Sequence, residues 1–196
     1  MRIASLLLTA IALATCAAAG DREYIEVSMY PYYHSPSKAW QVVIQSDGEV
    51  TYRESSYPVE VSSLPITVEP EWVDVSGRVT RVSEKQWKRL VELMQAASLE
   101  SLKSHYSAGY SVPSEDPDEF FARVVTHGDN YRIRLDIGDL KVDSAVYAPL
   151  SALSQQDPSH PQREEIRKIV EAWYHLLRVV GPVDGYRAKE YRRWVR

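Results

Sequence analysis

The chain has 196 residues, of which 26% are charged, and a formal net charge of −4. Its single cysteine excludes a disulfide framework, and its acidic balance argues against nucleic acid as a partner, because such proteins present a basic face. No apolar stretch reaches the roughly 20 residues of a membrane-spanning helix.

The first 19 residues are predicted to be a cleavable signal peptide. Arg2 gives a basic start, residues 3–13 are almost wholly apolar, and Ala17-Ala18-Ala19 supplies the small residues of a cleavage site. We therefore expect an exported protein, periplasmic or secreted. The stretch Leu13-Ala14-Thr15-Cys16 resembles a bacterial lipobox, although Thr15 replaces the usual Gly, Ala or Ser. Lipidation at Cys16, with anchoring at the cell envelope, is the alternative.

The first half of the mature chain has the pattern of a β-meander. Residues 24–30 alternate between apolar and polar side chains, which is typical of a half-buried strand. Residues 39–45 and 49–54 predict two further strands, joined by Asp47-Gly48, the strongest short signal for a hairpin. Residues 55–70, with three prolines, predict a loop or irregular edge, and residues 72–82 alternate again.

Two amphipathic helices are expected. Ser83 and Gln86 form the pattern of a capping box, and the residues after them recur at the helical period: Trp87, Leu90, Val91, Met94 and Ala97. The last helix is expected to begin near Ser159 or His160, with Pro161 in its first turn, and to end at Gly181-Pro182. Its predicted apolar stripe consists of Ile166, Ile169, Val170, Trp173, Leu177 and Val180.

The segment between the helices is predicted to hold a second hairpin. Residues 103–119 predict a long polar loop, whereas residues 120–126 and 131–137 predict strands joined by a turn at 127–130. Residues 139–147 add a short strand, and 149–161 predict a polar connection. This order of elements predicts an α+β fold, a meandering antiparallel sheet with two helices packed on one face. It would form one domain, residues 21–182, before a tail at 183–196.

Several of these stretches resemble a bacterial family of exported domains of unknown function, DUF6438. The similar blocks are residues 42–52, the helix from Val82-Ser83 to Leu102 and Tyr106, and Asp116-Pro117 with the strand that follows. The resemblance implies the fold and the compartment but no activity. The family's Cys-x-x-x-Cys-Pro stretch is replaced here by residues 30–36, which contain no cysteine.

No catalytic or metal-binding motif is present. The five histidines form no H-x-x-x-H pair, so we expect no metal and no cofactor, and we expect the histidines in loops to be solvated. The acidic run of residues 115–119 lacks the ligand spacing of a calcium loop. Neither a G-x-S-x-G elbow nor a phosphate-binding loop occurs. An envelope hydrolase that uses His105 and the 115–119 carboxylates remains the alternative function.

Aromatic loops and a basic tail are the candidate binding elements. Tyrosine and tryptophan in loops suit contacts with sugars or proteins, and the tail combines aromatic with basic residues that suit an anionic membrane surface. The body of the mature chain, residues 21–185, carries a net charge of −9 and could instead hold this tail. The candidate binding residues are Tyr32, Tyr33, His34, Tyr106, Tyr110, Arg192, Arg193 and Trp194.

Together these patterns predict a non-enzymatic binding or structural module of the cell envelope. The expected partner is an envelope protein or a cell-wall component, with an anionic membrane surface as a further partner of the tail.

Overall fold

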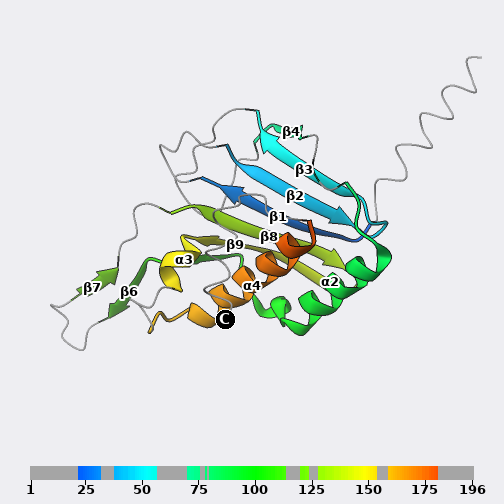
Figure 1. The fold of residues 1–196 in the computed structure, drawn as a ribbon. Helices are drawn as coiled ribbons and strands as arrows, with labels where there is room; N and C mark the ends of the chain where they lie inside the picture. Colours follow the sequence, from blue (N-terminus) through cyan, green and yellow to red (C-terminus); the bar gives the residue numbers. More distant parts are fainter. Residues whose placement is uncertain are drawn as a thin grey trace, which may run out of the picture.

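The computed structural model describes residues 22–31, 38–56, 70–75, 78, 80–113, 120–123, 128–153 and 159–180. They form a seven-stranded, mostly antiparallel open sheet, with helices α2 (Glu84–Ala96) and α4 (Arg163–Val180) on one face and in contact with each other (Figure 1). The predicted α+β class, with a largely antiparallel sheet and two helices on one face, is confirmed.

The strand order of the large sheet is β4-β3-β2-β1-β8-β9-β5. Its strands are β1 (Tyr24–Tyr30), β2 (Trp40–Gln45), β3 (Val50–Ser55), β4 (Trp72–Asp74), β5 (His105–Ser107), β8 (Asn130–Ile137) and β9 (Leu140–Tyr147). A separate two-stranded sheet pairs β6 (Tyr110–Pro113) with β7 (Phe120–Arg123). The first strand of the chain therefore lies in the centre of the sheet, where it joins the early meander to β8 and β9.

The predicted hairpin at Asp47-Gly48 is confirmed. β2 and β3 pair antiparallel across this turn, and Gly48 has a φ of 85°, in the left-handed region that glycine enters without strain. The Asp47 carboxylate accepts a hydrogen bond from the N–H of Glu49 at 3.0 Å. The carbonyl of Gly48 accepts one from the N–H of Val82 at 2.9 Å, so the turn also holds the chain that leads into α2.

The predicted second hairpin is wrong. β8 pairs with β9 across a turn at Gly138, whose φ is 55°, whereas β7 pairs with β6. The long loop predicted for residues 103–119 contains two strands, because β5 lies parallel to β9 at the sheet edge and β6 forms half of the small sheet. These partners come from distant or irregular segments, which local alternation does not reveal.

Smaller differences occur at element boundaries. The alternation of residues 72–82 yields only the three-residue β4. A short helix, α3 (Pro149–Ala152), lies in the predicted polar connection, and α4 begins at Arg163, so Pro161 precedes the helix instead of lying in its first turn. A 3₁₀ helix over Leu99–Ser101 follows α2.

The capping box of α2 is confirmed. The Gln86 backbone N–H donates to Oγ of Ser83 at 3.3 Å, and the Ser83 N–H donates to Oε1 of Gln86 at 2.8 Å. These two bonds satisfy donors that an uncapped helix start would leave without partners. The cap fixes the direction in which α2 leaves the turn, and so directs Trp87, Leu90 and Met94 into the core.

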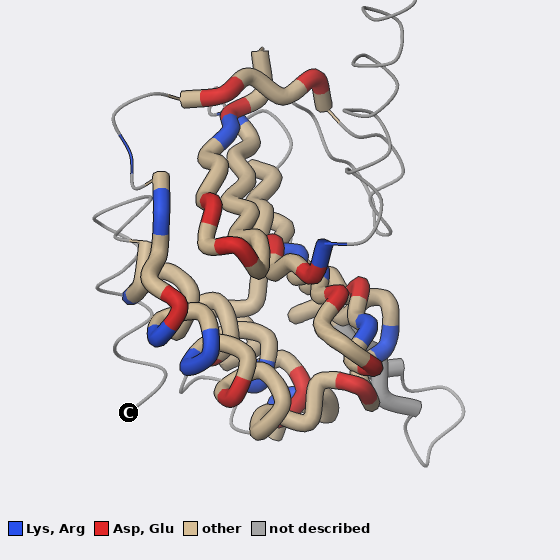
Figure 2. The backbone as a smooth tube through the Cα atoms, turned by 90° about the vertical axis from the view of Figure 1, so that its right-hand side faces the viewer, with Lys and Arg blue, Asp and Glu red and all other residues tan. Residues whose placement is uncertain are grey.

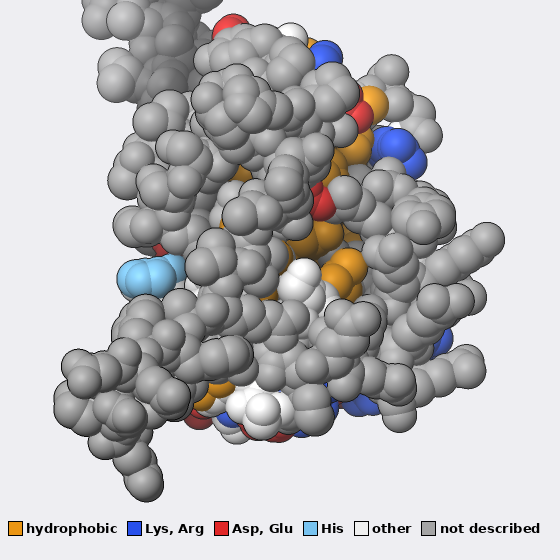
Figure 3. Space-filling view, turned by 90° about the vertical axis from the view of Figure 1, so that its left-hand side faces the viewer, with side chains coloured by type: hydrophobic (Ala, Val, Ile, Leu, Met, Phe, Trp, Pro, Cys, Tyr) orange, Lys and Arg blue, Asp and Glu red, His pale blue; other side chains and the backbone are white. Residues whose placement is uncertain are grey.

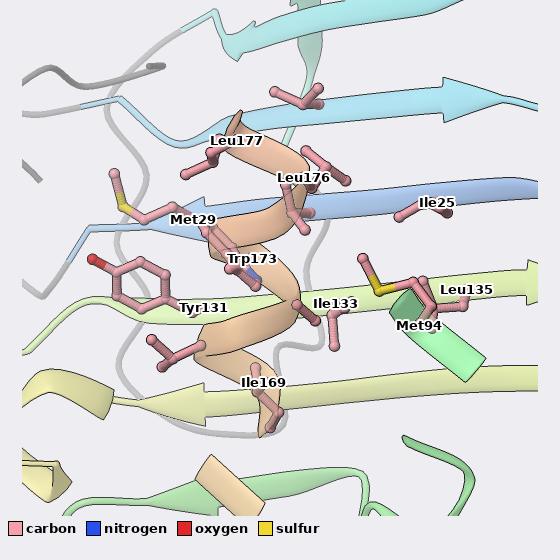
Figure 4. Close-up of a cluster of buried hydrophobic side chains, with 14 of the residues drawn as sticks. Ile25, Met29, Met94, Tyr131, Ile133, Leu135, Ile169, Trp173, Leu176 and Leu177 are labelled. Carbon is pink, nitrogen blue, oxygen red and sulfur yellow. The ribbon is translucent and has the colours of Figure 1, made fainter. Parts of the chain in front are cut away.

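The core lies between the sheet and the two helices. Side chains of α4 lie over β1 and β8, and Met94 of α2 lies beside Leu135 (Figure 4). The indole of Trp173 makes edge-to-face contacts with Trp40 and Tyr131, at centroid distances of 5.1 and 4.8 Å. The predicted stripe is confirmed except at Val180, which is only partly buried, and Ala172 and Leu176 complete it.

Charged residues on the outer helix surfaces are paired with each other. Lys88 and Glu84 lie 2.6 Å apart on α2, and Arg167 bonds both Glu164 and Glu171 on α4. Basic and acidic residues accordingly lie interspersed along the described chain in Figure 2. Exposed pairs of this kind contribute little to stability. No helix among the described residues is long and apolar enough to cross a bilayer.

Candidate functional site

The face of the sheet opposite the helices carries polar side chains across all seven strands. Because side chains alternate along a strand, the apolar residues of β1 face the helices and Glu26 and Ser28 face the other way. Strand register places the following residues in one row across this polar face: Asp74, Arg53, Gln41, Ser28, Arg132, Ala145 and His105. The face runs from β4 at one edge to β5 at the other.

One half of the polar face is a network of ion pairs. Asp143 accepts two bonds from Arg132, from Nε and from the terminal nitrogen, each 2.8 Å long. Arg134 lies between Asp143 at 3.5 Å and Glu26 at 3.8 Å. Hydrogen bonding from Arg132 lowers the pKa of the Asp143 carboxyl below its ordinary value, despite the opposing effect of burial.

Asp143 should make the folded chain less stable at acid pH. Because its pKa is lower in the folded than in the unfolded chain, it contributes stability above its unfolded pKa, near 3.8, and loses it as pH falls through the folded value. We expect Asp143→Asn to flatten the pH dependence of urea unfolding midpoints between about pH 5 and 2. Parallel curves for the variant and the wild type would contradict this contribution.

Three buried polar side chains lie beside this network, and one oxygen atom of each has no hydrogen-bond partner among the described residues. Oγ of Ser28, Oε1 of Gln41 and Oδ1 of Asn130 lack a partner among the described residues, and the side chains are 0%, 5% and 2% exposed. Ser28 faces Gln41 across β1 and β2, and Asn130 lies diagonally from Ser28 on β8. We call these residues the polar trio.

An aromatic pair borders the polar trio. The rings of Tyr30 and Trp72 meet edge to face at a centroid distance of 6.1 Å, although their strands lie at the centre and the edge of the sheet. The strand positions between them carry Ser55 and Ala39, both fully buried. Since these two side chains are small, they leave room for the rings to approach each other. Oγ of Ser55 accepts the Ala39 N–H at 3.0 Å.

The polar trio lies near the end of the sheet at which β1 ends and β2 and β8 begin. Figure 3 looks onto this end of the molecule, where some hydrophobic side chains of described residues are visible. A partnerless buried polar atom costs free energy, so a cluster of three on neighbouring strands requires a physical explanation. A bound ligand that donates hydrogen bonds is one such explanation.

The arrangement of the polar face suits binding better than catalysis. Of its carboxylates, Glu26, Asp74 and Asp143 each pair with an arginine, and Asp136 pairs with Lys141. Among the described residues, no group of three or more His, Cys, Asp or Glu side chains could hold a metal ion. Oγ of Ser104 lies 3.2 Å from Nδ1 of His105 on β5, but both side chains are exposed, and no described residue bonds the other ring nitrogen of His105.

The described histidines lie in different environments. His160 is buried: Nδ1 accepts a hydrogen bond from the Gln162 N–H at 3.1 Å, so Nε2 carries the proton and donates to the Ser107 carbonyl at 3.1 Å. It therefore connects the approach to α4 with β5. Burial lowers the pKa of His175, which flanks the apolar stripe of α4. His105 is exposed, but it lies on a strand and not in a loop.

Of the predicted binding residues, Tyr106 is the one whose side chain the structure describes. It is 3% exposed, and its hydroxyl accepts the Lys103 N–H at 2.8 Å, so it is a core residue of β5 and not an exposed aromatic contact. Tyr110 lies on β6, with its side chain outside the described part. The remaining predicted residues lie outside the described residues: Tyr32, Tyr33, His34, Arg192, Arg193, Trp194 and the lipidation candidate Cys16.

Sequence reasoning did not find the polar trio. Ser28 was assigned to the polar side of an alternating strand, where a serine is expected to meet water. Its burial follows from the central position of β1, which has a neighbour on each side. Gln41 and Asn130 carried no separate signal, because their proximity to Ser28 depends on pairing between β1, β2 and β8.

A hollow of about 310 Å³ lies at the opposite end of the sheet, between α2 and the β8–β9 turn. Trp87, Val91 and Ile137 form its apolar wall. Among its polar residues, Lys88 is paired with Glu84, and Glu23 accepts the Gly138 N–H at 2.8 Å. Its described side chains include no buried, partnerless polar atom, so it has weaker features of a site than the polar trio.

Comparison with known proteins adds no assignment. No protein-family model matches the chain, and no curated protein matches it. The resemblance to DUF6438 and the compartment it implies therefore remain predictions, and the candidate site rests on the geometry of the polar face alone.

Proposed function

We propose that this protein is an exported, non-enzymatic binding module of the cell envelope, and that it binds its ligand on the polar face of the sheet. The observation that carries the proposal is the polar trio: three side chains on adjacent strands are at least nine-tenths buried, and each has an oxygen without a partner in the described part of the chain. The leader of residues 1–19 supports the export of the chain.

Energetic reasoning supports a role for these groups outside folding. An apolar side chain of similar shape would fill each position without leaving a hydrogen-bonding group unsatisfied. Several charged residues of the face are paired with each other: Arg53 with Asp74 at 2.9 Å, and Arg132 with Asp143. Because these atoms are buried, a ligand would recover the cost of the trio after a local opening of this face.

Binding to envelope material tests this function. The purified mature chain, residues 21–196, should co-sediment with envelope fragments from a Gram-negative bacterium, one sample containing isolated cell-wall sacculi and the other membranes. We expect saturable binding to one of them that survives truncation at Pro182, because the polar face lies upstream of the basic tail. Binding lost with the tail would locate the function there, and no saturable binding to either fraction would overturn the proposal.

A further inference from the structure

The histidine that joins β5 to the start of α4 has both ring nitrogens bonded. His160 is 4% exposed. Its Nδ1 atom accepts a hydrogen bond from the Gln162 backbone N–H at 3.1 Å, and its Nε2–H donates to the Ser107 carbonyl at 3.1 Å. A nitrogen that accepts a bond from a backbone N–H carries a lone pair, so the folded protein holds this ring in its neutral form.

The bond to Gln162 caps the start of α4. The first N–H groups of a helix have no partner within the helix. The Gln162 carbonyl accepts the Ile166 N–H at 3.1 Å, and the His160 carbonyl accepts the Arg163 N–H at 3.0 Å, so the helical turns begin at this point. The His160 ring therefore serves the Gln162 N–H as a serine or asparagine side chain serves other helix starts. Its second bond ties the same turn to β5.

A proton on Nδ1 is incompatible with this cap. The imidazolium ion has an N–H on both nitrogens and accepts no hydrogen bond, so a protonated Nδ1 would face the Gln162 N–H as one donor against another. A positive charge is also unfavourable at a helix N-terminus, where the backbone dipoles already place partial positive charge. Because an unperturbed histidine takes up its proton near pH 6.5, mild acid favours an open state in which the ring is protonated and meets water.

Charged groups at this corner of the fold act in both directions. The titratable and charged side chains on the described elements that meet there are Arg163, Glu164 and Glu165 of α4, His105 of β5 and Asp129 before β8. The Arg163 guanidinium donates to the carbonyls of Ala152 and Leu153 at 3.0 and 2.8 Å, so a permanent positive charge lies beside the first turn. Glu164 favours a proton on the ring, but it is exposed and bonds Arg167. Arg163 and the helix dipole therefore oppose protonation of the closed corner.

We propose that His160 is an acid-sensitive latch: below about pH 6.5, protonation of its ring uncaps α4 and releases the start of that helix from β5. The opening is local, because the helix from Ile166 onward stays packed on the sheet through its buried face. The latch is independent of the proposed binding function, since it uses no residue of the polar trio.

Hydrogen exchange of single amides, measured by NMR on the full mature chain, tests the latch. We expect the protection factor of the Gln162 N–H to fall about 25-fold between pH 7.0 and 5.0, the effect of one proton taken up on opening. The imidazole nitrogen shifts of closed molecules should still show a neutral His160 ring with its proton on Nε2 at about pH 5.5, where an exposed histidine is largely protonated. A protection factor independent of pH, or a protonated ring with the cap intact, would overturn the proposal.

Matched variants separate His160 from the other histidines. In His160→Asn, Oδ1 can accept the Gln162 N–H, since asparagine commonly bonds the backbone two residues on, and this side chain does not titrate. We expect its Gln162 protection factor to be lower than in the wild type but constant between pH 7.0 and 5.0. His160→Gln, which keeps a donor for the Ser107 carbonyl, serves the same purpose if the asparagine variant does not fold.

Two further variants are the controls. His105→Asn and His175→Asn should keep the wild-type pH dependence at Gln162, because His105 is exposed on β5 and His175 lies far along α4. His175 is included because burial lowers its pKa, so it also favours acid unfolding. The same pH dependence in His160→Asn as in the wild type, or its loss in either control, would assign the effect to another group and remove the latch.

Discussion

Replacing Trp173 by alanine should lower the free energy of unfolding by about 3–5 kcal/mol, the range for removing a large aromatic side chain from a packed core. The indole is 1% exposed and packs edge to face against Trp40 and Tyr131. Its Nε1–H also donates to the backbone carbonyl of Arg132 at 3.1 Å. The substitution therefore removes packing, two ring contacts and one buried hydrogen bond together.

Urea unfolding of the purified mature chain measures this loss, with two companion variants. Trp173→Phe keeps a ring in the cluster but removes the indole N–H, so we expect a smaller loss. Tyr174→Ala lies next to it on α4, where the side chain is only partly buried, and should cost less than either. A loss below about 1 kcal/mol for Trp173→Ala would show that the core does not depend on this contact.

Replacing Gly48 by alanine should destabilise the chain by about 2–4 kcal/mol, because two separate effects add. Its φ of 85° is unfavourable for a residue with a side chain. A Cβ atom built there would also lie 2.5 Å from the Val82 carbonyl oxygen, which is backbone and cannot rotate away. The turn must then open or the chain before α2 must shift.

Gly138→Ala is the matched control for this prediction. Gly138 also has a positive φ, 55°, but its new Cβ would meet nothing closer than a Glu23 carboxylate oxygen at 3.9 Å. We expect a loss of about 1–2 kcal/mol from the backbone conformation alone. Equal losses in the two variants, measured by urea unfolding, would mean that the approach of Val82 to Gly48 has no energetic consequence.

The two faces of β1 lie in different environments, the apolar core on one side and the polar face of the sheet on the other. Its apolar residues Ile25, Val27 and Met29 are buried under the helices, where packing against α4 stabilises the central strand. Its polar residues Glu26 and Ser28 lie on the other face, where Ser28 keeps a partnerless hydroxyl. A stable core on one side can offset the cost of an unsatisfied polar cluster on the other, as is common at functional sites.

The sequence by itself determined the features that depend on near neighbours. The hairpin at Asp47-Gly48 follows from the conformational freedom of one glycine, and the start of α2 follows from Ser83 and Gln86, which bond each other within one helical turn. The helical period identified the buried face of α4 with Trp173 at its centre. Each signal lies within a few residues, so no distant partner had to be known.

Only the tertiary structure decided which strands pair and what lies between them. β1 pairs with β8, more than a hundred residues later, and β5 joins the edge of the sheet parallel to β9. This pairing buried Tyr106, which local polarity had placed in a long loop, and it brought Ser28, Gln41 and Asn130 together. Strand pairing is non-local, and burial follows from it, so a polar residue that looks exposed along the chain can lie at the centre of the fold.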